Sequence, residues 1–250
     1  MKALITGASS GIGRDMAREF VKKGYDVILI GRNEEKLQEI KNELKERAQI
    51  ISMDLSIKEN CIKLHEENKD IDVLVNNAGF GTFGKFVDTD LEKEINMINT
   101  NIVAVHTLTK LYLIDMYEKD KGYILNVASI AGLMPGPLMD AYYASKAYVV
   151  RLTEGIRAEL KKEKSNVKIS VLCPGPVNTN FNNVAGVKFN LHSLSSQYVA
   201  KYAVNKLFKN KFMIIPGITI KPIKFFSKIV PDNILAKFAF KAQQRKIGRG

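Results

Sequence analysis

A chain of 250 residues with 46% hydrophobic content is long enough to bury one full α/β core without help from disulfides or metals. Its two cysteines, Cys61 and Cys173, stand apart from other ligand-type residues, so neither a disulfide framework nor a metal site is expected. The net charge of +12 arises entirely in residues 180–250, which hold 13 Lys and Arg against the single acid Asp232.

Short β-branched runs alternate along the chain with longer stretches of helical spacing, which is typical of a parallel sheet covered by helices. Strands are predicted at residues 2–6, 26–30, 49–53, 73–76, 123–127, 168–173 and 212–215. Helices are predicted at residues 33–47, 89–119 and 140–162, and the last two have apolar positions broad enough to face a partner subunit. The expected fold is a Rossmann-type doubly wound α/β sheet of seven mainly parallel strands with helices on both faces.

Beyond the last predicted strand, Pro222 and Pro231 each stand where a short helix can begin, since proline fits the first helical turn. One dinucleotide-binding and catalytic domain is therefore expected over residues 1–215. Residues 216–250 are expected to form a basic helical C-terminal extension of that domain.

A glycine-rich turn follows the first predicted strand and opens a helix. It reads Thr6-Gly7-Ala8-Ser9-Ser10-Gly11-Ile12-Gly13. Glycines permit a tight turn and let backbone N–H groups at a helix N-terminus approach a pyrophosphate. Many turns after strands are rich in glycine, but the position of this one between a strand and a helix indicates a dinucleotide site.

The end of the second predicted strand distinguishes between the two nicotinamide dinucleotides. It reads Ile30-Gly31-Arg32-Asn33, without the carboxylate that usually accepts hydrogen bonds from the ribose of NAD. The planar guanidinium of Arg32 suits a 2′-phosphate, so NADP(H) is favoured over NAD(H). An ordinary solvent-facing arginine is the alternative for Arg32. Arg14 either adds positive charge to the site or pairs with Glu19 or Asp15.

Three later segments complete a recognisable pattern: Asp54-Leu55 after the third strand, Asn76-Asn77-Ala78-Gly79 after the fourth, and Pro174-Gly175-Pro176-Val177-Asn178-Thr179 after the sixth. With the glycine turn, they resemble the short-chain dehydrogenase/reductase family over residues 1 to about 215. The resemblance implies an adenine contact at the first segment, support of the sheet at the second and a nicotinamide-binding loop at the third. The cofactor contacts implied are Gly7, Ser9, Ser10, Gly11, Ile12, Gly13, Arg32, Asp54, Leu55, Asn77, Ala78, Gly79, Tyr142, Lys146, Pro174, Gly175, Val177 and Thr179.

Tyr142 and Lys146 are four residues apart and therefore share one face of a helix. A phenol with a pKa of about 10 moves protons poorly at neutral pH unless its anion is stabilised, which a lysine ammonium one turn away does. Tyr143 is the alternative, but Ala147 stands at the corresponding position and provides no cation. The pair predicts a proton-transferring tyrosine.

The resemblance supplies two further catalytic residues. Ser129, thirteen residues before Tyr142, matches the family's serine that bonds the substrate oxygen, and Tyr142 matches the acid that protonates it. Asn101 matches the asparagine that holds a water beside Lys146, although Asn99 is a competing candidate. An oxidoreductase that interconverts a ketone or aldehyde and an alcohol is therefore expected.

Residues 180–210 correspond to the family's substrate loop, and residues 180–200 are apolar without any acid. An apolar lid suits an acyl chain or another lipophilic ketone, and the basic charge nearby would attract coenzyme A or an acidic acyl carrier. A 3-oxoacyl reductase is therefore expected, with an acyl thioester as the substrate. A non-catalytic NADP(H)-binding or redox-sensing protein remains the alternative.

Residues 222–246 mix Phe, Ile and Leu with Lys and Arg. Such helices bind anionic membrane surfaces, or pack over an active site or another subunit with their lysines in water, and packing is favoured. A homodimer or homotetramer through the long helices is implied by the resemblance. Nucleic-acid binding is not expected, since no recognition motif accompanies the charge. The N-terminal residues leave no room for a signal peptide, so a cytoplasmic location is expected.

Overall fold

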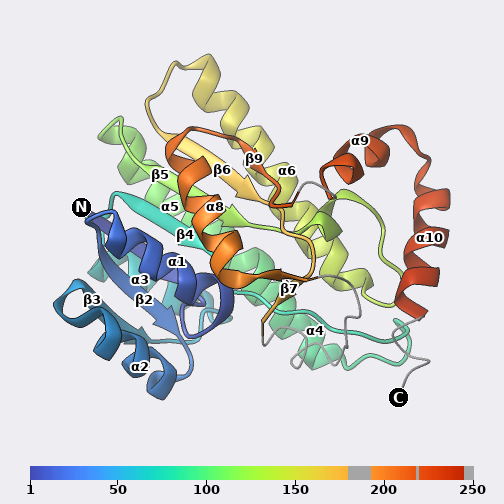
Figure 1. Ribbon diagram of the computed structural model, residues 1–250, viewed down its shortest axis with the longest axis horizontal. Helices are drawn as coiled ribbons and strands as arrows, with labels where there is room; N and C mark the ends of the chain where they lie inside the picture. Colours follow the sequence, from blue (N-terminus) through green and yellow to red (C-terminus); the bar gives the residue numbers. More distant parts are fainter. Residues whose placement is uncertain (180–192, 218–219, 245–250) are drawn as a thin grey trace.

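The computed structural model describes residues 1–179, 193–217 and 220–244. Figure 1 shows the chain as a central sheet with helices packed around it and two further helices at one end. The strands are β1 (Lys2–Thr6), β2 (Asp26–Gly31), β3 (Ala48–Ser52), β4 (Val73–Asn76), β5 (Tyr123–Val127), β6 (Lys168–Leu172), β7 (Val177–Asn178), β8 (Leu194–Ser195) and β9 (Met213–Ile214). The helices are α1 (Gly11–Lys22), α2 (Glu34–Leu44), α3 (Lys58–Glu67), α4 (Leu91–Ile98), α5 (Val105–Glu118), α6 (Asp140–Lys162), α8 (Ser196–Phe208), α9 (Lys221–Ile229) and α10 (Asp232–Gln244).

The main sheet has the strand order β3-β2-β1-β4-β5-β6-β9, and every neighbouring pair is parallel. The predicted Rossmann-type sheet of seven parallel strands is therefore confirmed. The chain winds outward from β1 in both directions, through β2 on one side and β4 on the other. Ligands of such sheets bind outside the carboxyl ends of the strands at this switch point, which lies just beyond Thr6 and Asn76.

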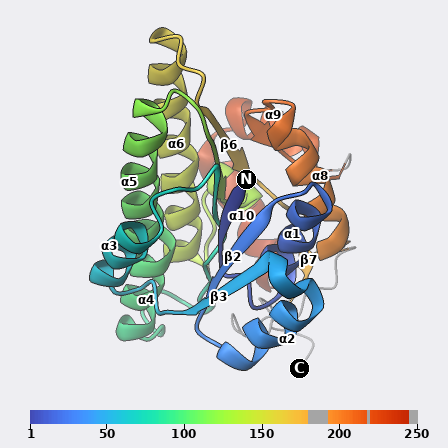
Figure 2. The ribbon, with the colours of Figure 1, turned by 90° about the vertical axis from the view of Figure 1, so that its left-hand side faces the viewer.

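Both faces of the sheet are covered, as Figure 2 shows: α1, α2 and α8 lie on one face and α3, α5 and α6 on the other. Phe20 of α1 and Val204 of α8 pack with the first set of strand side chains, and Leu64 of α3 and Tyr112 of α5 pack with the second. Because strands buried on both faces have no polar side, they appear in the sequence as continuous Val, Ile and Leu runs. This is why the strand predictions agree closely with the structure.

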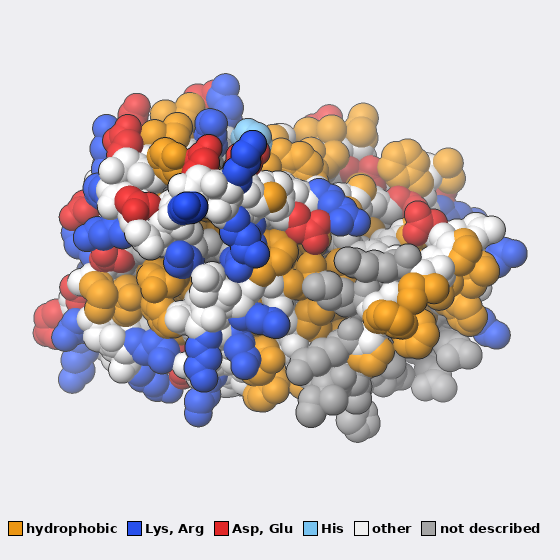
Figure 3. All heavy atoms as spheres, turned by 90° about the horizontal axis from the view of Figure 1, so that it is seen from above, with side chains coloured by type: hydrophobic (Ala, Val, Ile, Leu, Met, Phe, Trp, Pro, Cys, Tyr) orange, Lys and Arg blue, Asp and Glu red, His pale blue; other side chains and the backbone are white. Residues whose placement is uncertain are grey.

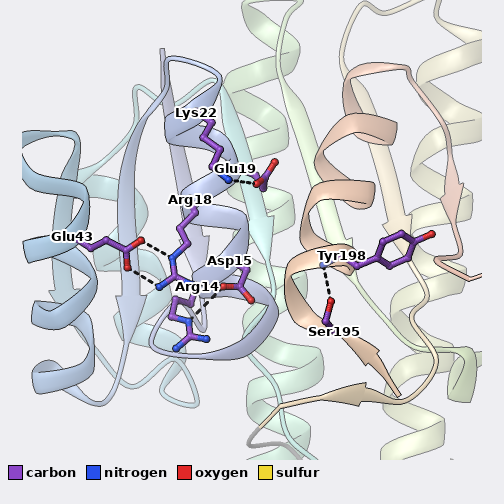
Figure 4. Close-up of polar contacts among 8 residues, drawn as sticks. All are labelled: Arg14, Asp15, Arg18, Glu19, Lys22, Glu43, Ser195 and Tyr198. Carbon is purple, nitrogen blue, oxygen red and sulfur yellow. Dashed lines mark hydrogen bonds and ion pairs between the residues drawn. The ribbon is translucent and has the colours of Figure 1, made fainter. Parts of the chain in front are cut away.

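Helix α1, which carries the glycine turn, is fixed to its neighbours by polar contacts at its surface (Figure 4). Arg18 forms two hydrogen bonds with the carboxylate of Glu43 in α2, at 2.6 and 2.7 Å, and a third with Asp15 at 2.6 Å. Helix α8 begins where the Ser195 side chain accepts a hydrogen bond from the backbone N–H of Tyr198 at 3.2 Å. The two Arg18–Glu43 hydrogen bonds therefore join α1, which opens with the glycine turn, to α2.

Two predicted segments differ from the structure. The helix predicted at 89–119 is divided into α4, a π-helical turn at Asn99–Ala104 and α5, and it starts after Asp90, whose side chain caps α4. Within the predicted lid segment at 180–210, residues 196–208 form α8, whose apolar face is buried against α1. A helix of the core is not a lid, so only residues 180–192 remain for that prediction, and they lie outside the described residues.

The C-terminal extension is helical, as predicted, with Pro222 in the first turn of α9 and Pro231 directly before α10. Helix α9 lies against the short 3₁₀ turn Ile130–Leu133 that follows β5. Among the described residues, no helix is both long enough and apolar enough to cross a membrane.

Candidate active site

A cavity of about 680 Å³ opens at the carboxyl ends of the parallel strands. Its wall contains the glycine turn, the residues after β2, β3, β4 and β5, the N-terminal part of α6, the loop after β6 and one residue of α10. Of the predicted cofactor contacts, all but Gly13 line this cavity, and of the predicted catalytic residues, all but Asn101 do. The fold thus brings together segments separated by up to 236 residues, from Gly7 to Gln243.

The glycine turn adopts a backbone that only glycine adopts easily. Gly7 and Gly11 have φ angles of 63° and 55°, in the left-handed region. Gly13 stands behind the cavity wall, where an added Cβ would lie 2.4 Å from both the Asn77 side-chain nitrogen and the Gly7 carbonyl oxygen. The same Asn77 nitrogen donates hydrogen bonds of 3.0 Å to the carbonyls of Thr6 and Gly7. Gly13 therefore shapes the turn, and Asn77 braces it.

The N-terminus of α1 faces this cavity through Ser10, Gly11 and Ile12. Ser10 precedes the helix in an extended conformation, and its side chain makes no capping hydrogen bond within the described part of the chain. The first N–H groups of a helix have no intrahelical acceptor and carry partial positive charge. These N–H groups are therefore the part of the cavity wall against which a pyrophosphate would bind.

Arg32 lies at the end of β2 with its side chain 61% exposed, 3.9 Å from a carboxylate oxygen of Asp54. Both residues line the cavity, and so does Lys36 in the first turn of α2, a residue that no sequence motif assigned to the site. Lys36 follows Arg32 by four residues in the sequence, so a second basic side chain lies near the same strand end. Two basic side chains therefore lie in the cavity wall at the end of β2.

Arg14 lies outside this wall. Its Nε is 3.6 Å from Asp15, as Figure 4 shows, so the ion-pair interpretation of Arg14 agrees with the structure. Asp15 is itself almost fully buried and also binds Arg18.

Tyr142, Ser129 and Lys146 meet in the central part of the cavity. The hydroxyls of Ser129 and Tyr142 form a hydrogen bond, and the Lys146 ammonium lies 5.9 Å from the centroid of the Tyr142 ring. Lys146 also donates a hydrogen bond of 3.0 Å to the carbonyl of Val127, at the end of β5. Ser129 is held in turn by the backbone N–H of Ala131, at 3.1 Å. The i, i+4 spacing of α6 and the end of β5 together fix this group.

Burial shifts both ionisable groups away from their charged forms. It raises the pKa of Tyr142, an effect that the hydrogen bond with Ser129 opposes. It lowers the pKa of Lys146 to about 8, while the nearby Cys173 acts in the opposite direction. Perturbed pKa values of two adjacent groups in one cavity are typical of catalytic sites.

Asn101 is fully buried behind the wall, in the π-helical turn between α4 and α5. Its amide pairs with both backbone groups of Phe80, at 3.1 and 2.9 Å, and donates to the Ser145 hydroxyl at 3.0 Å. A Cβ on Gly79 would lie 2.7 Å from the Asn101 oxygen and 3.3 Å from the Lys146 nitrogen. Asn101 and Lys146 therefore flank the same glycine, and the π turn, a feature common at functional sites, aims Asn101 there.

The loop after β6 forms another part of the wall. Pro174 accepts a hydrogen bond from the backbone N–H of Ile130 at 3.0 Å, which ties this loop to the turn after Ser129. Val177 pairs with Leu194 in the small sheet of β7 and β8. The Thr179 methyl lies over the glycine turn, 2.9 Å from where a Cβ on Gly11 would stand.

The side of the cavity beyond Tyr142 contains residues that the sequence analysis did not assign to the site. Gln243 of α10 is almost fully buried and donates a hydrogen bond of 3.0 Å to the Tyr143 hydroxyl. Apolar side chains complete this side: Phe80, Ile130 and Met139. No sequence signal identifies Gln243, because a glutamine near a chain end has no motif around it.

Among the described residues, no histidine lines this cavity. His65 pairs with Asp115 at 2.7 Å, and His106 with the Tyr148 hydroxyl at 2.7 Å, while His192 lies outside the described residues. The described residues hold no group of three or more His, Cys, Asp or Glu side chains arranged to bind a metal.

Comparison with known proteins agrees with this arrangement. The family model for short chain dehydrogenases matches residues 1–188. An uncharacterized oxidoreductase of Staphylococcus epidermidis is 31% identical over 226 residues, which cover 88% of this chain and 96% of that protein. A very-long-chain 3-oxoacyl-CoA reductase of Anas platyrhynchos is 41% identical over 172 residues, 64% of this chain and 55% of that protein. A solved short-chain dehydrogenase from Sphingobium yanoikuyae in complex with NADPH has a TM-score of 0.82 at 26% identity, covering 88% of this chain and 89% of that one.

Proposed function

This chain belongs to the short chain dehydrogenase family of oxidoreductases, and we propose that it reduces a lipophilic carbonyl compound with NADPH, with Tyr142 as the proton donor. The observation that carries the proposal is the hydrogen bond between Tyr142 and Ser129 beside the Lys146 ammonium, in the same cavity as the glycine turn.

The proton transfer follows from the positions of these three side chains. A bound NADPH would supply the hydride to the carbonyl carbon. The Tyr142 phenol donates its proton to the carbonyl oxygen as negative charge develops there, and the Ser129 hydroxyl holds the same oxygen. The product is an alcohol, and Tyr142 is left as the phenolate.

Lys146 stabilises that phenolate, because its ammonium lies 5.9 Å from the ring centroid. Without this cation, burial would make the anion of Tyr142 costly, since burial raises the pKa of the phenol. Asn101 contributes indirectly: its contacts with Phe80 and Ser145 fix the backbone around Gly79, against which Lys146 packs.

NADP(H) is proposed in preference to NAD(H) on the charge at the end of β2. Arg32 and Lys36 line the cavity there. Asp54 is the acidic neighbour, and its carboxylate lies 3.9 Å from Arg32. The Arg32 fork can form a charge-assisted pair with a phosphate, and Lys36 adds a second positive charge.

The proposed substrate is a 3-oxoacyl thioester. Phe80, Ile130 and Met139 give the substrate side of the cavity an apolar wall, which suits an acyl chain. The similarity to a very-long-chain 3-oxoacyl-CoA reductase supports the same substrate class, although the matched segment spans about half of that protein.

The test of the mechanism compares Tyr142→Phe with Tyr148→Phe on the same helix. Tyr148 bonds His106 outside the cavity, so its variant is a matched control. We expect Tyr142→Phe to lower the rate of NADPH oxidation by roughly 10²-fold or more, with NADPH binding retained, and the control to keep the wild-type rate. Equal rates for the two variants would exclude Tyr142 as the proton donor.

The test of the substrate uses 3-oxoacyl-CoA esters of increasing chain length beside steroids, quinones and simple ketones. We expect kcat/KM to rise with acyl length, because each buried CH₂ contributes about 0.8 kcal/mol. If kcat/KM does not change with acyl length and a compound of another class is preferred, the acyl substrate is rejected. The proposed proton transfer from Tyr142 would still stand. Absence of NADPH oxidation over the whole panel would favour the non-catalytic alternative.

A homo-oligomer is also proposed. Ile114 and Tyr117 on α5 are exposed apolar side chains that a partner subunit would cover. Sedimentation of the purified protein tests this, and a monomer at all concentrations would contradict it.

A further inference from the structure

The charge excess after residue 180 takes no part in the proton transfer proposed above, and part of it lies on α9 and α10. These two helices contain Lys221, Lys224, Lys228, Lys237 and Lys241 but a single acid, Asp232. Figure 3 shows hydrophobic side chains gathered at the same end of the molecule. Both the charge and the apolar surface therefore need an explanation.

Helix α9 exposes three large apolar side chains on one face. Phe225, Phe226 and Ile229 are 64%, 55% and 62% exposed. At 3.6 residues per turn, they fall within an arc of about 100°. Such a cluster differs from the scattered single apolar residues that any surface carries.

Helix α10 continues this pattern with its two faces clearly separated. Gln243 points into the cavity wall and is almost fully buried, whereas Ile234 and Phe238 are 40% and 70% exposed. On a helix these two residues lie on the side opposite Gln243. Lys241 is exposed on the same side as Phe238. The exposed face of α10 is thus apolar with lysine beside it.

We define the tail face as Phe225, Phe226, Ile229, Ile234 and Phe238. Two binding partners other than a membrane agree poorly with the charge and the apolar side chains of this region. A second copy in a twofold contact would set the same lysine-rich segment against itself, and like charges repel. A soluble acidic ligand such as coenzyme A would satisfy the lysines but leave the phenylalanines in water.

An anionic lipid surface satisfies both features at once. Amphipathic helices bind it with Phe and Ile at the boundary of the acyl chains and with Lys against the phosphate headgroups. We propose that α9 and α10 dock this protein on an anionic membrane surface through the tail face. Neither helix spans the bilayer, so the attachment is peripheral.

The docking surface adjoins the active site. Helix α9 lies against the turn that follows Ser129, and α10 supplies Gln243 to the cavity wall. A lipophilic substrate dissolved in the membrane would therefore have a short path to the cavity. The docking itself does not depend on turnover, because it concerns only the outer faces of the two helices.

Co-sedimentation with vesicles tests the proposal directly. We expect the full chain to bind phosphatidylcholine vesicles that contain phosphatidylglycerol, and to bind pure phosphatidylcholine much more weakly. Added salt should weaken the binding, since screening acts on exposed charges. Equal binding to both vesicle types, or no binding to the anionic ones, would overturn the proposal.

Two sets of variants locate the contact. The triple variant Phe225→Ser, Phe226→Ser and Phe238→Ser should lower the partition coefficient by at least roughly tenfold. Lys237→Glu with Lys241→Glu should lower it by roughly fivefold or more for each lysine. The three phenylalanines and two lysines changed in these variants are all exposed. Circular dichroism and the melting temperature should therefore stay close to those of the wild type.

Matched controls make the same changes elsewhere on the surface. Phe86→Ser removes a phenylalanine that is 65% exposed, and Lys93→Glu with Lys110→Glu reverses two exposed lysines. These controls should keep wild-type binding, and a loss as large as in the tail variants would overturn the assignment. If the triple variant instead converts a dimer to a monomer in sedimentation and leaves vesicle binding intact, the tail face is an interface between copies and the membrane proposal is wrong.

Discussion

The side-chain amide of Gln243 donates a 3.0 Å hydrogen bond to the hydroxyl of Tyr143, across 100 residues of sequence. This contact joins α10 to α6, the helix that carries Tyr142 and Lys146. Because both partners line the cavity beyond Tyr142, the C-terminal extension is part of the site and not only an appendage to the domain.

Gln243→Met keeps the length of the side chain and removes the donor. We expect KM for the carbonyl substrate to rise by roughly threefold to tenfold, because loss of one hydrogen bond costs about 0.5–1.5 kcal/mol. NADPH affinity should not change. Gln244→Met, at the exposed neighbouring position, is the control, and an equal effect of both changes would contradict a role for Gln243 in the substrate site.

A double-mutant cycle with Tyr143→Phe separates this hydrogen bond from general packing. If the two side chains act through their contact, KM of the double variant should be no higher than KM of the more impaired single variant. The coupling energy should then be about 1 kcal/mol. Additive losses in KM would show that the two residues act independently.

Arg32→Ser should lower the affinity for NADPH by roughly tenfold to a hundredfold while leaving NADH binding nearly unchanged, because hydrogen bonds to charged groups contribute about 1.5–3 kcal/mol. Fluorescence titration with both nucleotides measures this selectivity. Arg47→Ser is the control, since Arg47 is half exposed and pairs with Asp26 away from the cavity. A parallel loss for NADH would argue against recognition of a 2′-phosphate by Arg32.

Asn101→Ala should destabilise the protein by about 2–4 kcal/mol, because it removes the side-chain partner of both backbone groups of Phe80 and one of the two hydrogen bonds of the buried Ser145 hydroxyl. Urea unfolding measures the change. Asn42→Ala removes an exposed amide on α2 and should change the unfolding free energy by less than about 0.5 kcal/mol. If the two variants are equally stable, the Asn101 contacts do not support the π turn.

Lys146→Met should abolish turnover and yet raise the free energy of unfolding at pH 7, by about 1–2 kcal/mol, because it removes a charge whose burial is unfavourable. The sign follows from the pKa of Lys146, which burial lowers to about 8 in the folded protein from the ordinary lysine value of 10.5. At pH 7 Lys146 of the wild type is protonated in both the folded and the unfolded state, so the cost of burying its charge is fully present. As pH rises past 8 the folded state loses this proton first, so wild-type stability increases and the difference between the proteins shrinks. Urea unfolding at pH 7 and pH 9.5 checks this, and a variant that is less stable at pH 7 would contradict it.

Strand positions were predictable because β1, β4 and β5 are short apolar runs buried on both faces, and their predicted bounds coincide with the structure. Helix α6 was predicted with equal accuracy. The ends of the helix predicted over 89–119 agree with the helical segment 91–118 to within two residues, but its π turn was not predicted, because a π turn has no periodicity of its own and depends on the contacts of Asn101 with Phe80.

By itself, the sequence determined the sheet, the glycine turn and the pairing of Tyr142 with Lys146, since each depends on local spacing: strand runs, positive φ at Gly7 and Gly11, and the i, i+4 relation on a helix. Only the tertiary structure decided what lies opposite Tyr142. Gln243 reaches Tyr143, and α8 becomes part of the core, through contacts between segments far apart in the chain. Such contacts depend on how whole elements pack together, which no local pattern records.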